Sequence, residues 1–174
     1  DYGNKFGEPL IGGFCRSYGS FANNEYREWL KPIMFSAGIG KIQNENLFKG
    51  KAEPGMLIYK LGGPAYRIGI GGGSASSRNQ DKKNNSLDLS AVQRGNAEME
   101  NRLDRVIRSC AEMGYENPIE SIHDQGAGGT SNVTKEIIEP YGAEVNLDKI
   151  IKGDQTMTSL ELWVSEYQEQ NTVL

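Results

Sequence analysis

Cysteine, basic runs and long apolar stretches are all scarce in this sequence. Its two cysteines, Cys15 and Cys110, are too few and too far apart to indicate a disulfide framework or a zinc site. Such use of cysteine favours a reducing compartment, so we expect a cytoplasmic protein, with an organelle as the alternative. No apolar stretch approaches the length of a membrane span and the start is not a signal peptide, so we expect no membrane partner.

The charge and composition exclude further classes. The formal net charge is -4 and no Lys/Arg run occurs, so we expect no nucleic-acid partner. Hydrophobic residues make up 37% of the chain and glycine contributes 22 of the 174 residues, which favours many loops over a helical bundle. We expect an α/β (α+β) fold with mixed sheets and packed helices. The turn signature Glu53-Pro54-Gly55 is the candidate boundary between two domain pieces.

Hydrophobic periodicity and turn signals predict the secondary structure. The first 24 residues indicate short extended pieces broken by glycine, and residues 78–88 indicate a polar surface loop. The clearest helix has one apolar stripe, formed by Met99, Leu103, Val106, Ile107, Cys110 and Met113. Strands are predicted over residues 31–42, 56–61, 66–70, 118–123, 143–147 and 169–174, and helices over 97–113, 132–139 and 157–164.

One segment combines a strand, a glycine loop and a helix start around Asp124. The apolar run before Asp124 leads into Gly126, Gly128 and Gly129, and a helix-like segment follows. Bare backbone N–H groups at such a loop can bind phosphate, and a carboxylate there can hold a divalent cation such as Mg²⁺. The alternative is that Asp124 only caps the turn through its own backbone. Three glycines favour the ligand site, because a capping Asp does not require them.

His123 is the only histidine, and it directly precedes this carboxylate. Neighbouring side chains of a strand point to opposite faces. If Asp124 faces a site, His123 therefore faces the packing side. We expect a partly buried structural histidine rather than a catalytic base.

Three other segments are weaker candidates for ligand contacts. The loop with Gly71, Gly72 and Gly73 resembles a phosphate cradle but lacks a Walker lysine, and close backbone packing explains it equally well. Gln93 precedes the amphipathic helix, where a glutamine is usually just exposed. The polar run 166–170 can hydrogen-bond a ligand, although a solvated connection is the simpler interpretation.

Several long motifs in one order resemble the phosphoribosylformylglycinamidine synthase family, in its large single-chain, eukaryote-like form. They occupy residues 1–11, 62–73, 91–95, 122–129 and 160–169. The resemblance implies a piece of a longer polypeptide of the aminoimidazole-ribonucleotide-synthetase superfamily, which also carries a glutaminase domain. Residues 1–50 would end an N-type domain, and 51–174 would form most of a C-type domain, truncated at its C-terminus.

The resemblance also implies a reaction. Formylglycinamide ribonucleotide, ATP and glutamine become the formylglycinamidine, ADP, phosphate and glutamate in purine biosynthesis. ATP would phosphorylate the amide oxygen, and ammonia from glutamine would displace that phosphate. This makes the implied enzyme a C–N ligase with glutamine as amide donor.

The family's roles carry over at few positions. Asp124 matches a magnesium ligand, and Gln93 matches a substrate-binding position. The run Glu166-Tyr167-Gln168 matches a substrate-binding Glu-x-Gln, with Tyr167 in place of a small residue. Gly71, Gly72, Gly73, Gly126 and Gly128 would lie near phosphate or nucleotide. No catalytic residue carries over, so we expect this chain alone to show no turnover.

Two rival functions remain open at the level of the sequence. One keeps the superfamily but changes the reaction to that of a phosphate-transferring relative; such relatives lack the Glu166–Glu169 run. The other is a non-catalytic structural or nucleotide-binding half of a pseudo-symmetric protein.

Overall fold

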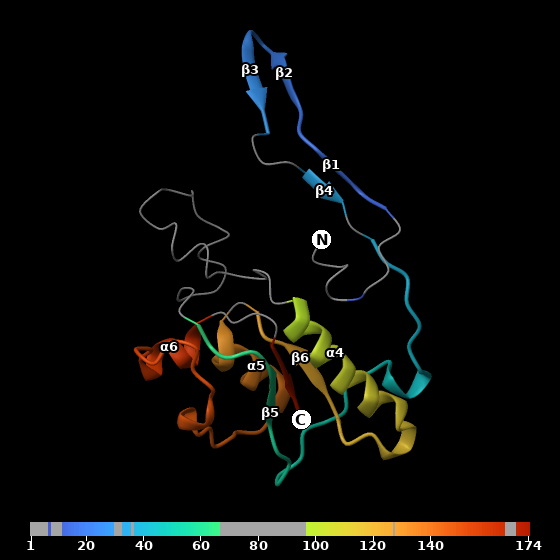
Figure 1. Ribbon diagram of the computed structural model, residues 1–174, viewed down its shortest axis with the longest axis vertical. Coiled ribbons are helices and arrows are strands. Elements are labelled where there is room, and N and C mark those ends of the chain that lie inside the picture. Colours follow the sequence, from blue (N-terminus) through green and yellow to red (C-terminus); the bar gives the residue numbers. More distant parts are fainter. Residues whose placement is uncertain are drawn as a thin grey trace.

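A computed structural model describes residues 7, 12–29, 33–35, 37–66, 97–126, 128–165 and 170–174. Two small antiparallel strand pairs precede a body built from one sheet and three α-helices (Figure 1). The strands are β1 Phe14–Arg16, β2 Gly19–Ala22, β3 Glu25–Glu28, β4 Ile33–Phe35, β5 Tyr59–Gly62, β6 Ile122–Asp124 and β7 Gln170–Val173. The helices are α4 Ala97–Glu112, α5 Gly129–Ile138 and α6 Ser159–Val164, with 3-10 turns η1 Asn44–Asn46, η2 Gly114–Glu116 and η3 Leu147–Lys149.

The N-terminal strands extend away from the body (Figure 1). β2 and β3 form a hairpin that turns at Asn23 and Asn24, whose φ angles of 52° and 65° are those of a two-residue hairpin turn. None of the residues described in 12–29 and 37–50 is buried. The predicted strand over 31–42 is wrong beyond Phe35, since residues 37–43 form no strand. Gly38 and Gly40 interrupt this segment, and glycine weakens strand interiors.

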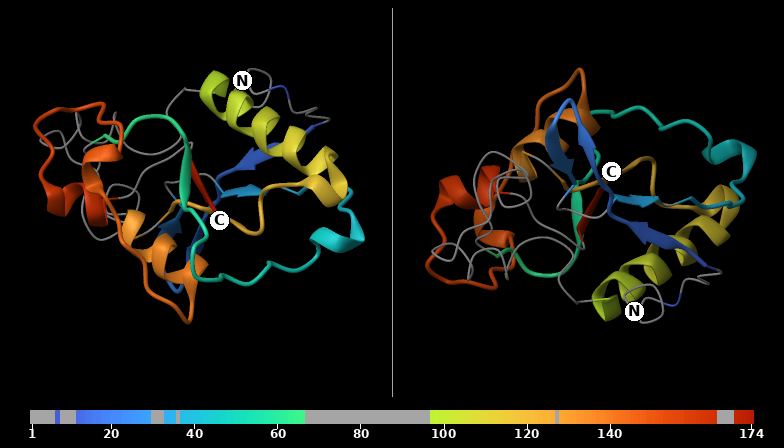
Figure 2. Two further views of the ribbon diagram at one scale, coloured as in Figure 1. Left: turned by 90° about the horizontal axis from the view of Figure 1, so that it is seen from below. Right: turned by 90° about the horizontal axis from the view of Figure 1, so that it is seen from above.

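The body is organised around a three-stranded sheet in the order β5-β7-β6. β7 runs antiparallel to both neighbours, and Thr172 pairs with Lys60 on one side and His123 on the other. Helices α4 and α5 lie on opposite sides of this sheet (Figure 2). The expected class of sheets with packed helices is confirmed, and all pairings between the described strands are antiparallel.

Helix α4 forms where the periodicity predicts it, but only part of its apolar stripe is core. Leu103 is buried, whereas Val106 and Met113 are about half exposed at 50% and 51%. On the exposed face, Arg102 forms an i,i+4 ion pair with Glu98 at 2.5 Å. The stripe therefore attaches the helix through its first half.

Several boundaries and one further element differ from the predictions; β5 begins three residues and β6 four residues later than predicted. Helix α5 begins at Gly129, three residues earlier than expected, because the last glycine of the loop already belongs to the helix. The predicted strand over 143–147 is wrong. Asn146 accepts a hydrogen bond from the Asp148 backbone and opens the 3-10 turn η3 there. Helix α6 has a capping box between Thr158 and Glu161, which defines its start.

Two small hydrophobic clusters hold the body together. Both combine residues from distant parts of the chain: the first ties α5 and the last residue to the segment before β5, and the second ties α6 to the segment after β5. The first contains Ala52, Ile137, Ile138 and Leu174, and the second Ala65, Met157 and Leu162.

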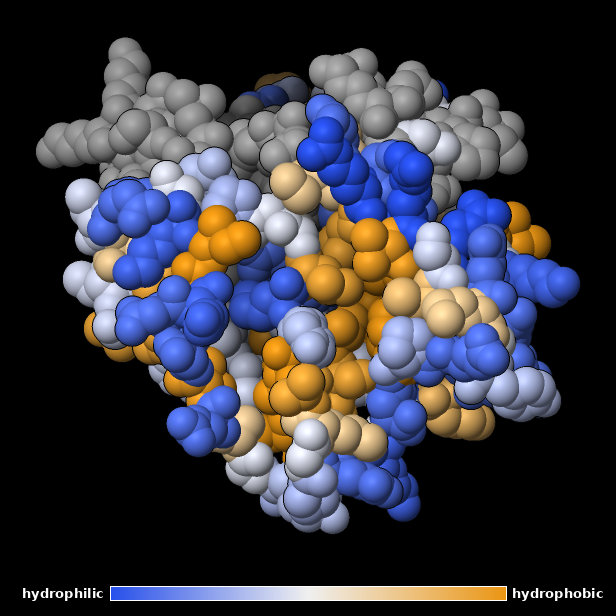
Figure 3. All heavy atoms as spheres, turned by 60° about the horizontal axis from the view of Figure 1, so that its bottom comes forward, coloured by the Kyte–Doolittle hydropathy of each residue, from blue (hydrophilic) through white to orange (hydrophobic). Residues whose placement is uncertain are grey.

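Apolar side chains also reach the surface. They gather in the middle of the lower face, between hydrophilic side chains (Figure 3). An exposed apolar patch is typical of a surface that contacts another part of a protein. Among the described residues, no helix combines the length and apolar character that crossing a bilayer requires.

Candidate functional site

The end of β5, the end of β6 and the start of β7 lie at one edge of the sheet. Gly62 at the end of β5 pairs with Gln170 at the start of β7, and Asp124 at the end of β6 pairs with Asn171. Because β7 is antiparallel to its neighbours, the chain leaves β5 and β6 at the edge where it enters β7. The ends of β5 and β6 and the start of β7 therefore lie together at this edge.

The turn after Asp124 is fixed by two glycines in left-handed backbone conformations. Gly128 has φ 83° and Gly129 has φ 59°, values that residues with a side chain rarely adopt. A methyl group on Gly129 would overlap the backbone carbonyl oxygen of Ser165. Gly129 is therefore required both for its conformation and for close packing against the end of α6.

The same loop contacts Ser165 and Gln170, which flank residues 166–169 in the sequence. Ser165 packs on Gly129, and the backbone N–H of Gln125 donates to the carbonyl oxygen of Gln170 at 3.0 Å. Ser165 is fully buried and Gln170 is 7% exposed, so these two anchors are part of the packed body. The two described residues that flank this run in the sequence thus both lie beside the glycine loop.

Asp124 presents its carboxylate to solvent. Its side chain is 86% exposed, and a Cβ atom on Gly126 would lie 3.8 Å from its Oδ2. The carboxylate is not turned inward. This arrangement leaves Asp124 able to bind a ligand from outside the protein.

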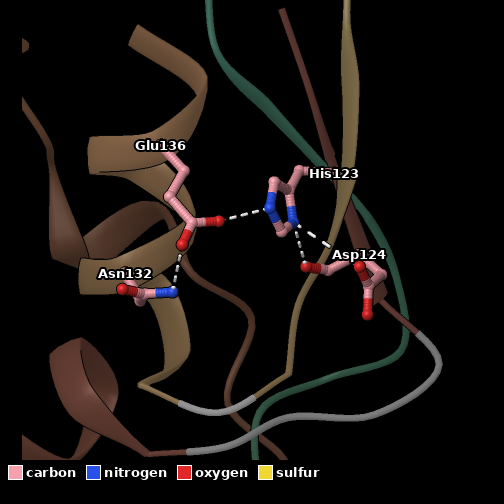
Figure 4. Close-up of polar contacts among 4 residues, drawn as sticks. All are labelled: His123, Asp124, Asn132 and Glu136. Carbon is pink, nitrogen blue, oxygen red and sulfur yellow. Dashed lines mark hydrogen bonds and ion pairs between the residues drawn. The ribbon is translucent and has the colours of Figure 1, made fainter. Parts of the chain in front are cut away.

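His123 lies on the opposite side of the strand and is held between two acidic residues (Figure 4). Its Nε2 contacts Oε2 of Glu136 on α5, and its Nδ1 lies 2.7 Å from the backbone oxygen of Asp124 and 3.5 Å from Oδ1. Its side chain is 24% exposed. The expectation of a partly buried, structural position agrees with these contacts.

The start of α5, which follows the turn after Asp124, offers hydrogen-bond donors. Gly128 occupies the N-cap position and has no side chain to cap the first turn, where backbone N–H groups lack intrahelical partners. The Ser131 hydroxyl donates to the Gly128 carbonyl oxygen at 2.7 Å. A helix of ten residues with such a start favours anions.

Several predicted site residues lie outside the described residues. These are Gln93, Glu166, Tyr167 and Gln168, together with Gly71, Gly72 and Gly73. Of the predicted positions, the structure therefore places Asp124, Gly126 and Gly128, and it brings them together in one turn. Within the described residues, no group of three or more His, Cys, Asp and Glu side chains could hold a metal ion by itself.

A cavity that the sequence did not suggest lies between β5, α5 and the segment around η3. Its volume is about 420 Å³, and Lys60 is in its wall with Thr130, Thr134 and Gln170. The Lys60 ammonium donates to the Thr130 hydroxyl at 3.2 Å. Burial lowers the pKa of Lys60 from 10.5 to about 7. In the sequence, only the alternation of side chains along β5, which puts Lys60 on the face of the strand toward α5, could have indicated that Lys60 lines this cavity.

We expect the Lys60 amine to react with acetic anhydride with a half-maximal rate near pH 7. A free lysine amide used as internal standard titrates near 10.4, so its rate continues to rise well above that pH. Between pH 7 and 10.5 the folded protein binds fewer protons at Lys60 than the unfolded chain does, so this residue's contribution to stability rises with pH there. Mass spectrometry of the labelled peptides measures the acetylation rate against pH. If the rate at Lys60 follows that of the standard, the pKa of Lys60 is not lowered.

The sequence profile of one protein family matches the part of the chain that carries this site. It is AIR synthase related protein, C-terminal domain, and it matches residues 53–174. The chain belongs to this family. The AIR synthase related domain thus includes β5, the glycine loop with Asp124, and β7.

Relatives of this AIR synthase related chain are similar over its whole length. One from Arabidopsis thaliana, named probable phosphoribosylformylglycinamidine synthase, chloroplastic/mitochondrial, is 58% identical over 100% of this chain and 12% of its own length. A Homo sapiens protein named phosphoribosylformylglycinamidine synthase is 53% identical over 100% of this chain and 13% of its own. The chain therefore spans only about an eighth of these relatives, and the motif resemblance is confirmed.

Solved structures show the same fold. T. maritima PurL complexed with FGAR has a TM-score of 0.65 and 28% identity, covering 99% of this chain and 27% of that one. T. maritima PurL complexed with ATP has a TM-score of 0.60 and 25% identity, covering 99% of this chain and 25% of that one.

Proposed function

We propose that this chain is part of a phosphoribosylformylglycinamidine synthase, an ATP-dependent ligase of purine biosynthesis that uses glutamine. The observation that carries the proposal is the similarity over the full chain to proteins of that name, at 58% and 53% identity. Residues 1–50 end an N-type domain and residues 51–174 form most of a C-type domain. A glutaminase domain elsewhere in the same polypeptide supplies ammonia.

The edge of the sheet is the proposed ligand site. Asp124 presents an exposed carboxylate, and α5 presents the start of a helix beside it. Gln93 and the run Glu166-Tyr167-Gln168 bind formylglycinamide ribonucleotide, since amides both donate and accept hydrogen bonds, as an amide-and-sugar substrate requires. Support comes from Ser165 and Gln170, which flank this run in the sequence and lie beside the glycine loop.

The residues present fit a magnesium ion. Mg²⁺ usually takes one or two carboxylates, several waters and phosphate oxygens, and Asp124 supplies one hard oxygen ligand at an open position. When bound, Mg²⁺ would neutralise charge on the phosphates during phosphoryl transfer. Asp124 would hold the cation, and backbone N–H groups of Gly126, Gly128 and the first turn of α5 would be available to the phosphates.

The proposed reaction proceeds in two displacements. The substrate's amide oxygen attacks the terminal phosphorus of ATP and ADP leaves. Ammonia then adds to the activated carbon and phosphate leaves, which gives the amidine. The chain's own contribution is to bind and orient the phosphates and the amide, and we assign it no proton-transfer group. Location in the cytoplasm is part of this proposal, with an organelle in lineages such as that of the plant relative.

Isothermal titration of the full-length protein tests this assignment. We expect Asp124→Asn to weaken binding of the magnesium nucleotide at least tenfold, because a metal-bound oxygen becomes a neutral amide. We expect Gln168→Ala to weaken binding of formylglycinamide ribonucleotide by a similar factor, equivalent to about 1.4 kcal/mol. Asp148→Asn changes an exposed carboxylate on η3 and is the control. If neither variant weakens binding of either ligand, this chain has a structural role and the proposal fails.

A further inference from the structure

A second set of contacts lies directly behind Asp124, on the side of the strand that faces α5 (Figure 4). Glu136 contacts His123 Nε2 through Oε2, and its Oε1 accepts a hydrogen bond from Asn132 Nδ2 at 2.9 Å. The other ring nitrogen of His123 lies 2.7 Å from the Asp124 backbone oxygen. A continuous chain of polar contacts therefore joins the first turns of α5 to the end of β6.

Asp124 has few other restraints. It ends a strand of three residues, its side chain is 86% exposed, and a glycine turn follows it. An exposed aspartate at such a place can adopt several rotamers in solution. His123 restricts this freedom, because its Nδ1 faces both the backbone oxygen and Oδ1 of Asp124, the latter at 3.5 Å. Oδ2 is then the oxygen left to an incoming cation.

Glu136 in turn restrains the imidazole. Glu136 is half-exposed at 48%, but Asn132 binds one of its oxygens and the ring of His123 contacts the other. Both residues are on α5, whose buried face packs into the body through Val133 and Ile137. The orientation of His123 is thus set by a packed helix rather than by a loop.

We propose that His123 is a positioning residue for the cation-binding carboxylate of Asp124, and that Glu136 and Asn132 hold the imidazole in place for this role. The inference rests on the proposed function, since it requires Asp124 to bind a cation. Residues that orient a metal ligand through hydrogen bonds typically change metal affinity by 10- to 100-fold when they are removed. We expect His123→Ala to fall in that range.

Two substitutions of similar size separate positioning from simple support of the fold. In His123→Asn the amide nitrogen can take the place of Nδ1 and keep the contact with Asp124. In His123→Gln the amide nitrogen can take the place of Nε2 and keep the contact with Glu136. Positioning predicts that His123→Asn retains cation affinity within about threefold, while His123→Gln loses about tenfold or more. A purely structural link to α5 predicts the reverse order.

The measurement is a titration of the full-length protein with Mn²⁺ as the probe, in which electron paramagnetic resonance counts the free ion. Asp124→Asn first identifies the site by removing it. Glu112→Gln, which changes an exposed carboxylate paired with Arg108 on α4, is the matched control and is expected to bind as wild type. Amide exchange of the α5 peptides shows whether each variant is folded.

The outcomes distinguish the two proposals. If Asp124→Asn leaves the number and affinity of bound Mn²⁺ ions unchanged, the proposed function fails and the positioning role fails with it. If Asp124→Asn removes one ion while His123→Ala and His123→Gln bind as wild type, or His123→Gln binds more tightly than His123→Asn, only the positioning role is overturned. Selective loss in His123→Gln and His123→Ala supports it.

Discussion

Replacing Gly129 with alanine is expected to destabilise the α5 region by about 3 kcal/mol. The left-handed conformation at φ 59° costs a residue with a side chain about 1 kcal/mol. The added methyl group also overlaps the carbonyl oxygen of Ser165, and overpacking against a rigid partner typically costs a further 1–3 kcal/mol. The overlapped atom belongs to the backbone at the end of α6, so no side chain can rotate away.

Amide hydrogen exchange of the full-length protein measures this effect locally. Peptides from α5 and β7 are expected to exchange more than a hundredfold faster in Gly129→Ala, since each 1.4 kcal/mol of local stability is a factor of ten. Gly142→Ala is the matched control, because a Cβ atom there meets nothing within 4 Å. Equal exchange in the two variants would show that Gly129 and Ser165 are not packed together in solution.

The sequence indicated the elements whose signals are local. The helix at 97–112 has a long apolar period and was predicted within about two residues, as was the strand at 170–173. Strand β3 was missed because its side chains are all exposed and carry no apolar pattern. Residues 143–147 were assigned as a strand, but in a segment this short the pattern of apolar residues does not distinguish a strand from coil.

In the site, too, the features with local sequence signals could be predicted and those that depend on packing could not. The glycine loop and Asp124 could be predicted because strand, turn and helix start follow one another in the sequence. The contact between His123 and Glu136 could not, since it depends on how α5 packs against β6. The lowered pKa of Lys60 also depends on packing, because it follows from burial against a helix that lies seventy residues further along the chain.

Loss of the Asp124 carboxylate is expected to have the largest effect on activity. In the full-length protein, we expect Asp124→Asn to lower kcat/KM for formylglycinamide ribonucleotide at saturating magnesium ATP by about a hundredfold or more. A hundredfold corresponds to about 2.7 kcal/mol, which is within the transition-state stabilisation that a metal ion supplies in phosphoryl transfer. Asn has the same shape as Asp, so the packing of β6 is preserved.

Steady-state assays over a range of Mg²⁺ concentrations separate weakened metal binding from a failed chemical step. If Asp124 only binds the cation, activity in Asp124→Asn recovers as Mg²⁺ rises; if it also sets the geometry of phosphoryl transfer, kcat stays low at every concentration. Because the carboxylate is 86% exposed and has no hydrogen-bonding role in the core, a loss of activity with unchanged amide exchange must come from the site. Wild-type activity of Asp124→Asn at limiting Mg²⁺ would place the cation elsewhere in the enzyme.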